Sequence, residues 1–328
     1  MKPAIRILIF FVLFILCSSQ ILSAATDYPS RPVTLIVPMA PGGSRDILAR
    51  SFASAAEKFL GQPVVVVNKP GATGMIGLQA GAQAAPDGYT LTSTSTSDTC
   101  AIEWEIANGR KPVVNPKQFA AIASLNMSPS LIIVPYDSPW KKLADLIQDI
   151  KGKPGYYAFC SGGLYGVSHM PAEIFARALG LKLRHVPYAG GGPCINAVVG
   201  KHVDFSTQFP SSCTHLAKGN KLRILAVQGD RRLRSIPDVP TVKELGIDAE
   251  WYQWVGVSAP LKTPAPIVQK LREVAKKVVE DKSYIQVVEN LGDEVHYLIG
   301  DEMVKYWGAE TEKVRGIMTD LAKEPPKK

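Results

Sequence analysis

Two glycine-rich segments carry the residues best suited to hold an anion. Residues 37–44 read Val-Pro-Met-Ala-Pro-Gly-Gly-Ser and residues 186–193 read Val-Pro-Tyr-Ala-Gly-Gly-Gly-Pro, so they agree at five of eight positions. Each segment follows a run of apolar, β-branched residues and precedes a helical pattern. Such a turn exposes backbone N–H groups at the positive end of a helix dipole, which attracts anions. Glycine turns also serve as ordinary connectors, but a matched pair predicts one shared ligand site.

Two further polar segments can contribute to that site. Residues 160–169 read Cys-Ser-Gly-Gly-Leu-Tyr-Gly-Val-Ser-His and lie between a predicted strand and a predicted helix. Residues 93–98 read Ser-Thr-Ser-Thr-Ser-Asp and directly follow another predicted strand. Their hydroxyl and amide groups can hydrogen-bond a polar ligand, although either segment can equally be a solvated loop.

The histidines do not form a recognisable catalytic or metal-binding motif. They stand at positions 169, 185, 202, 215 and 296, without the spacing that places two metal ligands on one helix face. The GxSxG, HExxH and GxxxxGK(S/T) motifs are absent. His169 opens a helix and is expected to cap or orient its loop, whereas His185 is expected in the core. We predict no catalytic residue, no metal site and no cofactor. An exported enzyme acting on a carboxylic acid is the main alternative.

The cysteines leave their pairing open. Cys100, Cys160, Cys194 and Cys213 lie beyond the predicted leader, and an even number permits disulfides in an oxidising compartment. Four cysteines allow three pairings, between which the sequence does not choose. Their spacing contains no CxxC, so zinc and thioredoxin-like chemistry are not expected.

The elements that position these loops follow a strand, glycine turn, helix pattern that repeats along the chain. The first half predicts strands at 33–37, 64–67 and 89–92, and a helix that starts at Ser44 and stops at Gly61. Ser44 suits the N-cap of this helix and Asp46 adds a favourable negative charge to its first turn. The second half predicts strands at 156–159, 183–186, 203–207 and 222–227, and helices at 169–179, 193–199 and 210–218. Regular alternation of this kind indicates two α/β lobes, each a doubly wound sheet flanked by helices.

Length and charge narrow the class of protein further. A chain of 328 residues fits two domains, and its net charge of +8 is spread too evenly to form a nucleic-acid-binding stripe. Residues 1–25 resemble a signal peptide, with Lys2 and Arg6 before eleven consecutive apolar residues. Such a run is too short to span a bilayer. We therefore expect an exported protein that is cleaved near Ala25 and works in the periplasm.

Taken together, these motifs resemble the Bug or TctC family, the periplasmic solute-binding receptors of tripartite tricarboxylate transporters. The similarity runs from residue 28 nearly to the C-terminus. The motifs that carry it are Pro-Gly-Gly-Ser-Arg-Asp-Ile-Leu-Ala-Arg at 41–50, Gly-Gln-Pro-Val-Val-Val at 61–66, Asn-Lys-Pro-Gly-Ala at 68–72, Ala-Pro-Asp-Gly-Tyr-Thr-Leu at 85–91, His-Val-Pro-Tyr at 185–188, Gly-Asn-Lys-Leu-Arg at 219–223 and Pro-Asp-Val-Pro-Thr at 237–241.

The resemblance implies a two-lobed type II periplasmic binding protein, in which the chain crosses between lobes near 131–135 and 251–260. Lobe 1 then comprises residues 26–130 and 251–328, and lobe 2 residues 131–250, with the ligand cleft between them. The implied ligand-binding residues come from both lobes. They are Met39, Ala40, Pro41, Gly42, Gly43, Ser44, Ser93, Thr94, Ser161, Gly162, Gly163, Tyr165, His169, Tyr188, Gly190, Gly191 and Gln208.

Three segments depart from the family pattern. Tyr165 stands where relatives tend to have glycine, so it can narrow the cleft or stack on a ligand ring. Residues 100–116 look unlike the usual segment and bring Glu103, Trp104 and Glu105 near the predicted cleft. Residues 204–210 are one residue shorter than usual, which bears on the role of Gln208. These differences concern the identity of the ligand more than its class.

The implied function is the capture of a small carboxylate by lobe closure. The resemblance implies a dicarboxylate, a tricarboxylate, an acidic amino acid or an aromatic acid, held mainly by neutral donors rather than by a buried lysine or arginine. The implied partners are the membrane subunits of a tripartite tricarboxylate-type transporter, and the protein is expected to be a monomer that binds no nucleic acid. A receptor that signals to a membrane sensor is a further alternative, because it would bind the same ligand with the same lobes.

Overall fold

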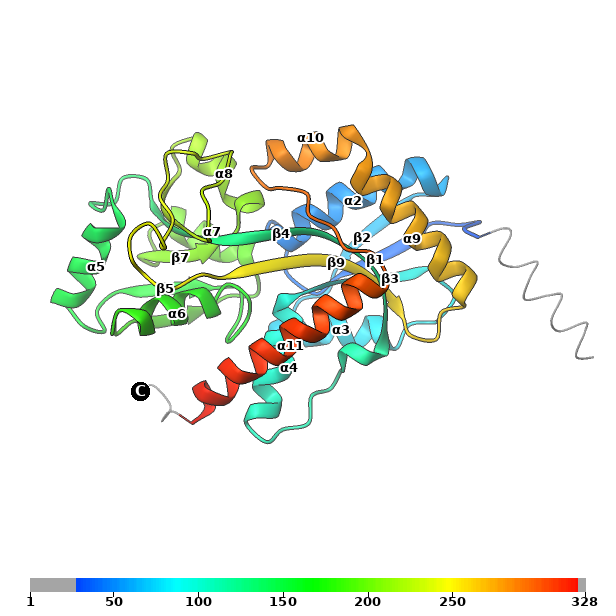
Figure 1. Cartoon of the computed structure of the whole chain (residues 1–328), viewed down its shortest axis with the longest axis horizontal. Coiled ribbons are helices and arrows are strands. Elements are labelled where there is room, and N and C mark those ends of the chain that lie inside the picture. Colours follow the sequence, from blue (N-terminus) through cyan, green and yellow to red (C-terminus); the bar gives the residue numbers. More distant parts are fainter. Residues whose placement is uncertain (1–27, 324–328) are drawn as a thin grey trace, which may run out of the picture.

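The computed structural model describes residues 28–323, so the predicted signal peptide and its cleavage site lie outside the described residues. The chain forms two α/β lobes joined by two long strands, β4 (Phe119–Pro135) and β9 (Tyr252–Pro260) (Figure 1). Within residues 28–323, none of the helices combines the length and apolar character needed to cross a bilayer.

The sheet of lobe 1 has the strand order β2-β1-β3-β9-β4. Strand β1 (Val33–Val37) pairs in parallel with β2 (Val64–Asn68) and β3 (Thr90–Ser95), and β9 runs antiparallel to β3 and β4. The helices of this lobe are α2 (Ser44–Leu60), α3 (Met75–Ala82), α4 (Thr96–Ala107), α9 (Ala265–Glu280), α10 (Lys282–Asn290) and α11 (Asp301–Ala322), with short 3-10 turns at Ala72–Gly74 and Pro116–Gln118.

The sheet of lobe 2 is built around β5 (Ala158–Ser161), which pairs in parallel with β6 (Arg184–Pro187) and β7 (Phe205–Gln208). Strand β4 runs antiparallel to β7 and to β8 (Leu222–Gln228). Its helices are α5 (Leu143–Gly152), α6 (Met170–Ala178), α7 (Gly191–Val199) and α8 (Pro210–Lys218).

Strand β4 passes from one sheet into the other. Up to Pro129 it pairs with β9, and from Ser130 it pairs with β8. The returning chain runs beside this point, because the backbone N–H of Ser130 donates to the carbonyl of Trp251 at 2.9 Å. The two crossings of the chain between the lobes therefore lie side by side.

Each lobe has its own apolar core, and a third cluster joins them. In lobe 1 the side chains of Ile267, Leu271, Val274 and Val278 recur at helical spacing on α9 and pack onto the sheet. Lobe 2 is built on Phe159, Phe175 and Phe205, among others. The joining cluster brings together side chains of both lobes and of the hinge, namely Cys100, Met170, Phe209, Trp251, Val314, Met318 and Leu321.

Three local expectations are wrong. The N-cap of α2 is Gly43, so Ser44 is the first helical residue rather than the cap. Helix α7 begins at Gly191 rather than at Pro193. Glycines can take helical angles, and proline is tolerated within the first helical turn because it has no N–H group that needs an acceptor. Strand β3 runs on to Ser95 because residues 92–95 pair with β9, so the polar segment 93–98 is not a loop but the end of a strand and the start of α4.

Candidate ligand-binding site

The two glycine loops face each other and touch. A Cβ atom added to Gly43 would lie 3.2 Å from the backbone nitrogen of Gly191. One added to Gly192 would lie 2.1 Å from the carbonyl oxygen of Pro41. The backbone N–H of Ala40 also donates to the carbonyl of Ala189 at 3.3 Å. The lobes are therefore closed, and this approach of two backbones requires residues without side chains.

Two helix N-termini meet at this contact. Helix α2 begins at Ser44 and α7 at Gly191, and their N-cap residues, Gly43 and Gly190, make no side-chain capping hydrogen bond. The N–H groups of a first helical turn have no acceptor within the helix. Because both dipoles point their positive ends to the same place, the site favours a negatively charged group.

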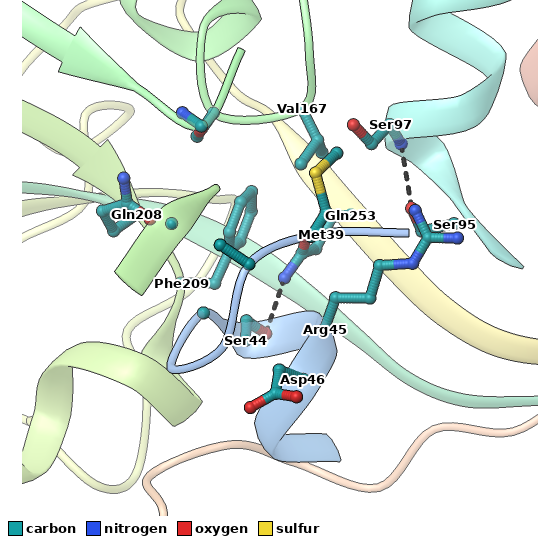
Figure 2. Close-up of a pocket in the computed structure, with 15 residues that line it drawn as sticks. Met39, Ser44, Arg45, Asp46, Ser95, Ser97, Val167, Gln208, Phe209 and Gln253 are labelled. Atoms are coloured by element: carbon teal, nitrogen blue, oxygen red, sulfur yellow. Dashed lines mark hydrogen bonds between the residues drawn. The ribbon is translucent and has the colours of Figure 1, made fainter. Parts of the chain in front are cut away.

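A cavity of about 40 Å³ lies between the loops (Figure 2). A cavity of this size is roomy enough for a small polar group such as a carboxylate. Its lining includes some of the predicted residues, which are Met39, Ala40, Gly43, Ser44, Gly162, Gly191 and Gln208.

The one arginine that lines the cavity is already neutralised. The Nη1 and Nη2 atoms of Arg45 donate to the two carboxylate oxygens of Asp98 at 2.7 and 2.9 Å, and both side chains are buried. Its Nε atom donates to the hydroxyl of Ser93 at 3.2 Å. Burial raises the pKa of Asp98, while the adjacent guanidinium of Arg45 lowers it. Arg45 therefore shapes the lobe 1 wall without adding net charge to it.

The acid in the first turn of α2 is also fully engaged. The carboxylate of Asp46 accepts hydrogen bonds from the backbone N–H of Gly42 at 3.0 Å and from the side-chain amide of Asn68 at 2.8 Å. It also pairs with Arg50 at 3.0 Å. Gly42 has a φ of +86°, which other residues rarely adopt. Asp46 thus fixes the shape of the first glycine loop.

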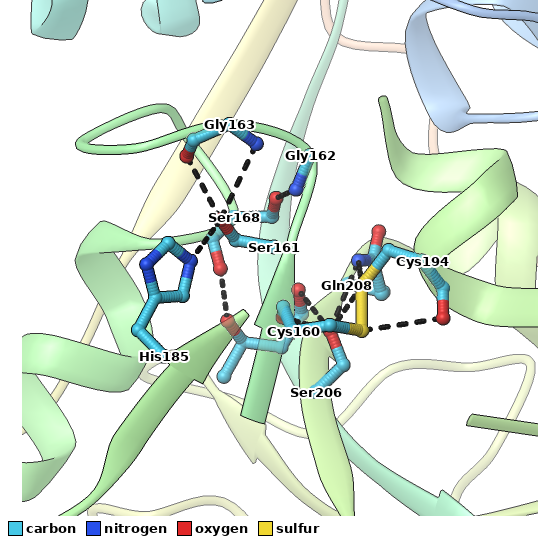
Figure 3. Close-up of a disulfide and its surroundings, with 10 residues drawn as sticks. Cys160, Ser161, Gly162, Gly163, Ser168, His185, Cys194, Ser206 and Gln208 are labelled. Carbon is cyan, nitrogen blue, oxygen red and sulfur yellow. Dashed lines mark hydrogen bonds between the residues drawn. A yellow bond between two sulfur atoms is a disulfide. The ribbon is translucent and has the colours of Figure 1, made fainter. Parts of the chain in front are cut away.

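A disulfide fixes the lobe 2 wall. Cys160, at the end of β5, is bonded to Cys194 in α7, so it ties the segment 161–169 to the second glycine loop (Figure 3). The side-chain amide of Gln208 donates to the Cys194 sulfur at 3.2 Å and to the Ser206 hydroxyl at 3.0 Å, which places Gln208 against the cavity. This is the pairing that the sequence left open.

The remaining two cysteines within residues 28–323 are free and buried. Burial raises the pKa of the Cys213 thiol to about 12 and that of the Cys100 thiol well above its ordinary value. Both thiols are therefore protonated at neutral pH, and neither is an activated nucleophile.

Several predicted residues support the cavity instead of lining it. Ser93 accepts from Arg45, and the hydroxyl of Thr94 lies 2.9 Å from that of Ser258. The hydroxyl of Ser161 lies 2.7 Å from Nε2 of His185. The backbone N–H of Tyr188 donates to the carbonyl of Ser161 at 2.9 Å.

His169 and Tyr165 belong to one local arrangement. The backbone N–H of Tyr165 donates to Nδ1 of His169 at 2.7 Å. The His169 ring stacks on that of His185, with centroids 3.9 Å apart, and its Nε2 lies 3.3 Å from Glu173. The phenol ring of Tyr165 stacks on Trp104. The last four predicted residues, Pro41, Gly42, Gly163 and Gly190, form the backbone of the loops.

Other residues around the cavity were missed from the sequence. They are Arg45, Asp46, Ser95, Ser97, Val167, Ser168, Phe209 and Gln253. The first six lie in segments that the sequence analysis had already assigned to the site, so adjacent residues in the chain could have indicated them. Gln253 had none, because it lies on β9, far along the chain, and its side-chain amide donates to the Ser44 hydroxyl at 2.9 Å (Figure 2).

The site contains donors for an anion but no recognisable metal centre. Among residues 28–323, no three histidine, cysteine, aspartate or glutamate side chains are grouped so that they could hold a metal ion. The polar groups around the cavity are amides, hydroxyls and paired charges. This arrangement suits reversible binding of an anion.

The chain belongs to the tripartite tricarboxylate transporter receptor family TctC, whose model matches residues 48–322. It is 32% identical to the protein BugT of Bordetella pertussis over 302 residues, covering 88% of this chain and 91% of BugT. A UPF0065 protein of Cupriavidus necator, from the gbd 5′ region, is also 32% identical over 302 residues, covering 90% of this chain and 89% of that protein.

Solved structures agree with this assignment. The periplasmic binding protein BugD superposes with a TM-score of 0.81 at 30% identity, covering 90% of this chain and 98% of BugD. MatC of Rhodopseudomonas palustris, solved with malate, gives 0.80 at 26% identity, with coverage of 90% and 100%. A second R. palustris protein, solved with adipate, gives 0.82 at 26% identity, with coverage of 89% and 98%. The family and these structures are periplasmic solute-binding proteins, so this chain is a binding protein and not an enzyme.

Proposed function

We propose that this protein captures a small dicarboxylate between its lobes in the periplasm and delivers it to the membrane subunits of a tripartite tricarboxylate-type transporter. The observation that carries the proposal is the meeting of two helix N-termini, neither capped by a side chain, at Gly43 and Gly191. The signal-peptide pattern at residues 1–25 supports export, with cleavage near Ala25, and we propose that the mature protein is a monomer.

Selectivity for an anion follows from the balance of charge around the cavity. Arg45 is paired with Asp98 and Asp46 with Arg50, so these side chains cancel and the partial positive charge of the two helix ends remains. Hydrogen bonds to a charged acceptor contribute roughly 1.5–3 kcal/mol each. The Ser44 hydroxyl adds a neutral polar group to the lobe 1 side of the cavity.

Lobe closure follows from where these donors lie. A carboxylate between α2 and α7 contacts both lobes only when they are closed, and this difference in contact is what shifts the population toward the closed state. A dicarboxylate is favoured because the related MatC and adipate-bound structures hold dicarboxylates.

The test is a thermal-shift and calorimetry screen of the mature protein against malate, adipate, citrate, aspartate and benzoate. An acid present at 100 times its dissociation constant stabilises the folded state by about 2.7 kcal/mol. The proposal predicts this stabilisation for malate or adipate, with the acid recovered unchanged. Failure of every carboxylate to bind, or formation of a product, would contradict it.

The largest expected effect of a substitution is that of Gly192→Ala. Its Cβ would lie 2.1 Å from the carbonyl oxygen of Pro41 in the opposite lobe, so the lobes cannot close fully. We expect the affinity for the bound acid to fall by at least about 100-fold. The matched control is Gly308→Ala on α11, where an added Cβ meets no atom within 4 Å. Wild-type affinity in Gly192→Ala would show that closure of these loops is not needed for binding.

A further inference from the structure

A stacked aromatic pair spans the two lobes beside the site. Trp104 lies on α4 of lobe 1 and Tyr165 on the segment 161–169 of lobe 2. Their ring centroids are 3.6 Å apart and the ring planes are inclined by 26°. Neither ring lines the cavity, which is lined by other residues of the same two elements, such as Ser97 and Val167.

The pair lies over the apolar cluster that joins the lobes. Trp104 and Tyr165 both pack against this cluster, in which Cys100 comes from lobe 1, and Met170 and Phe209 come from lobe 2. Contacts of this kind exist only while the lobes are together. They are also separate from the hydrogen bonds of the glycine loops, because they involve side chains rather than the backbone.

The segment that carries Tyr165 is shaped against lobe 1. Tyr165 has a φ of +51°, which is uncommon for a residue with a large side chain. Cβ atoms added to Gly163 and Gly166 would lie 2.9 and 3.1 Å from the Thr73 side chain. The Thr73 hydroxyl donates to the carbonyl of Leu164 at 3.4 Å. The left-handed turn at Tyr165 therefore presents its ring to a partner in the other lobe.

We propose that the Trp104–Tyr165 stack is a latch that stabilises the closed state without touching the ligand. A contact that forms only in the closed state lowers the free energy of that state. This gain is added to the binding free energy of any ligand that closes the lobes. The latch therefore tightens binding of different acids by the same factor, whereas a residue that contacts the ligand would discriminate between them. This inference rests on the proposed function.

The first experiment measures dissociation constants for malate and adipate by calorimetry. Tyr165→Gly keeps the left-handed backbone but removes the ring, and we expect it to weaken both acids by the same factor, about 3- to 10-fold. Trp104→Leu should do the same, and the double variant should be no weaker than either single variant. Tyr165→Phe, which retains the stack, should bind as wild type. Tyr156→Leu, at an exposed ring elsewhere in lobe 2, is the matched control.

A second experiment needs no ligand. Small-angle scattering of the ligand-free protein should give a larger radius of gyration for Tyr165→Gly than for wild type, approaching that of Gly192→Ala, in which closure is blocked. If no acid binds to wild type, the proposed function fails while this measurement still tests the latch. Unequal factors for malate and adipate, additive losses in the double variant, or unchanged affinity together with an unchanged radius would each overturn the latch.

Discussion

The two halves of the site present the same backbone geometry but hold it in place by different means. Both consist of a strand, a glycine loop and a helix whose N-cap is a glycine without a side-chain cap. In lobe 1 the loop is fixed by charged side chains, and in lobe 2 it is fixed by a disulfide and neutral groups. Because the two lobes hold the same loop geometry by different side-chain contacts, we infer that the feature they have in common, the exposed backbone N–H groups, is what the geometry serves to present.

The lobe 1 half depends on complete pairing of its charges. Asp46 is held by Arg50 and by the N–H of Gly42, and Arg45 by Asp98. An unpaired charge beside the cavity would be costly to bury and would also attract or repel the ligand by itself. In the proposed function, this complete pairing leaves the helix ends as the source of selectivity for an anion.

The lobe 2 glycine loop contains no charged residue. The first turn of α7 contains neither acidic nor basic residues, and its anchor is the covalent bond from Cys194 to Cys160. Around this bond, Gln208 and Ser206 complete a neutral hydrogen-bond network. The two lobes should therefore respond differently to loss of charge, to reduction and to pH.

Breaking the lobe 1 pair should have the largest effect on stability. Asp98→Ala leaves the buried guanidinium of Arg45 without its bidentate partner, and we expect a loss of about 3–5 kcal/mol in unfolding free energy. Chemical denaturation measures it. The double variant Arg45→Met with Asp98→Leu should lose less than the single variant, because no unpaired charge stays buried. A double variant that is less stable than Asp98→Ala would contradict this account.

Removing the lobe 2 disulfide should have the next largest effect. The bond closes a loop with a sequence separation of 34, for which the chain-entropy relation gives about 3–4 kcal/mol. Cys160→Ala with Cys194→Ala, or treatment of wild type with a reductant, should lower the unfolding free energy by this amount in denaturant titrations. Cys213→Ala, at a free buried thiol, controls for the loss of a buried sulfur. If the control and the double variant lose the same unfolding free energy, the disulfide itself does not stabilise lobe 2.

Lobe 1 should also depend on pH through Glu310 of α11, which lies outside the glycine-loop half of the site. Its carboxylate accepts from Thr96 and Thr99 of α4 and from Trp254 of β9. Burial raises the pKa of Glu310 from 4.5 to about 7, although these hydrogen bonds oppose the shift. Between these two pH values the folded state keeps a proton that the unfolded chain releases, so stability falls as pH rises through this window.

The variant Glu310→Gln cannot titrate and therefore escapes this loss. Relative to wild type its unfolding free energy should rise by about 2–3 kcal/mol from pH 5 to pH 8, since one pKa unit corresponds to about 1.4 kcal/mol. Denaturant titrations at the two pH values measure the difference. A difference that does not change with pH would mean that Glu310 is ionised throughout, and the pH response would then not distinguish the two lobes.

Much of the fold could be predicted because it is encoded locally. Strand β1 and helix α8 have the bounds that the residue pattern gave, and the paired glycine loops were recognised from their spacing. The end of β3 could not be predicted in this way, because Ser93 and Thr94 read as loop residues and become strand residues only by pairing with β9. Their partner lies more than 150 residues away along the chain, and no local pattern reports it.

The candidate site divides in the same way. The loop residues Ala40, Gly43 and Gly191 could be named from the sequence because a glycine turn before a helix has a local signature. Gln253 and Phe209 could not be named in this way. Gln253 lies on the strand β9 that joins the lobes, and Phe209 lies at the short junction between β7 and α8, so neither has such a local signature. Likewise, the sequence left Tyr165 either to narrow the cleft or to stack on a ligand ring, and the structure places its ring on Trp104.

The amino-acid sequence by itself determined the two α/β lobes, the paired glycine turns and the family of periplasmic receptors. Only the tertiary structure decided that Arg45 is neutralised by Asp98, that Cys160 is bonded to Cys194, and that Trp104 meets Tyr165 across the cleft. The physical reason is range. Turns and helices follow from forces between near neighbours in the chain, whereas charge pairing, disulfide pairing and lobe contact depend on distances that exist only after the two lobes have folded and closed.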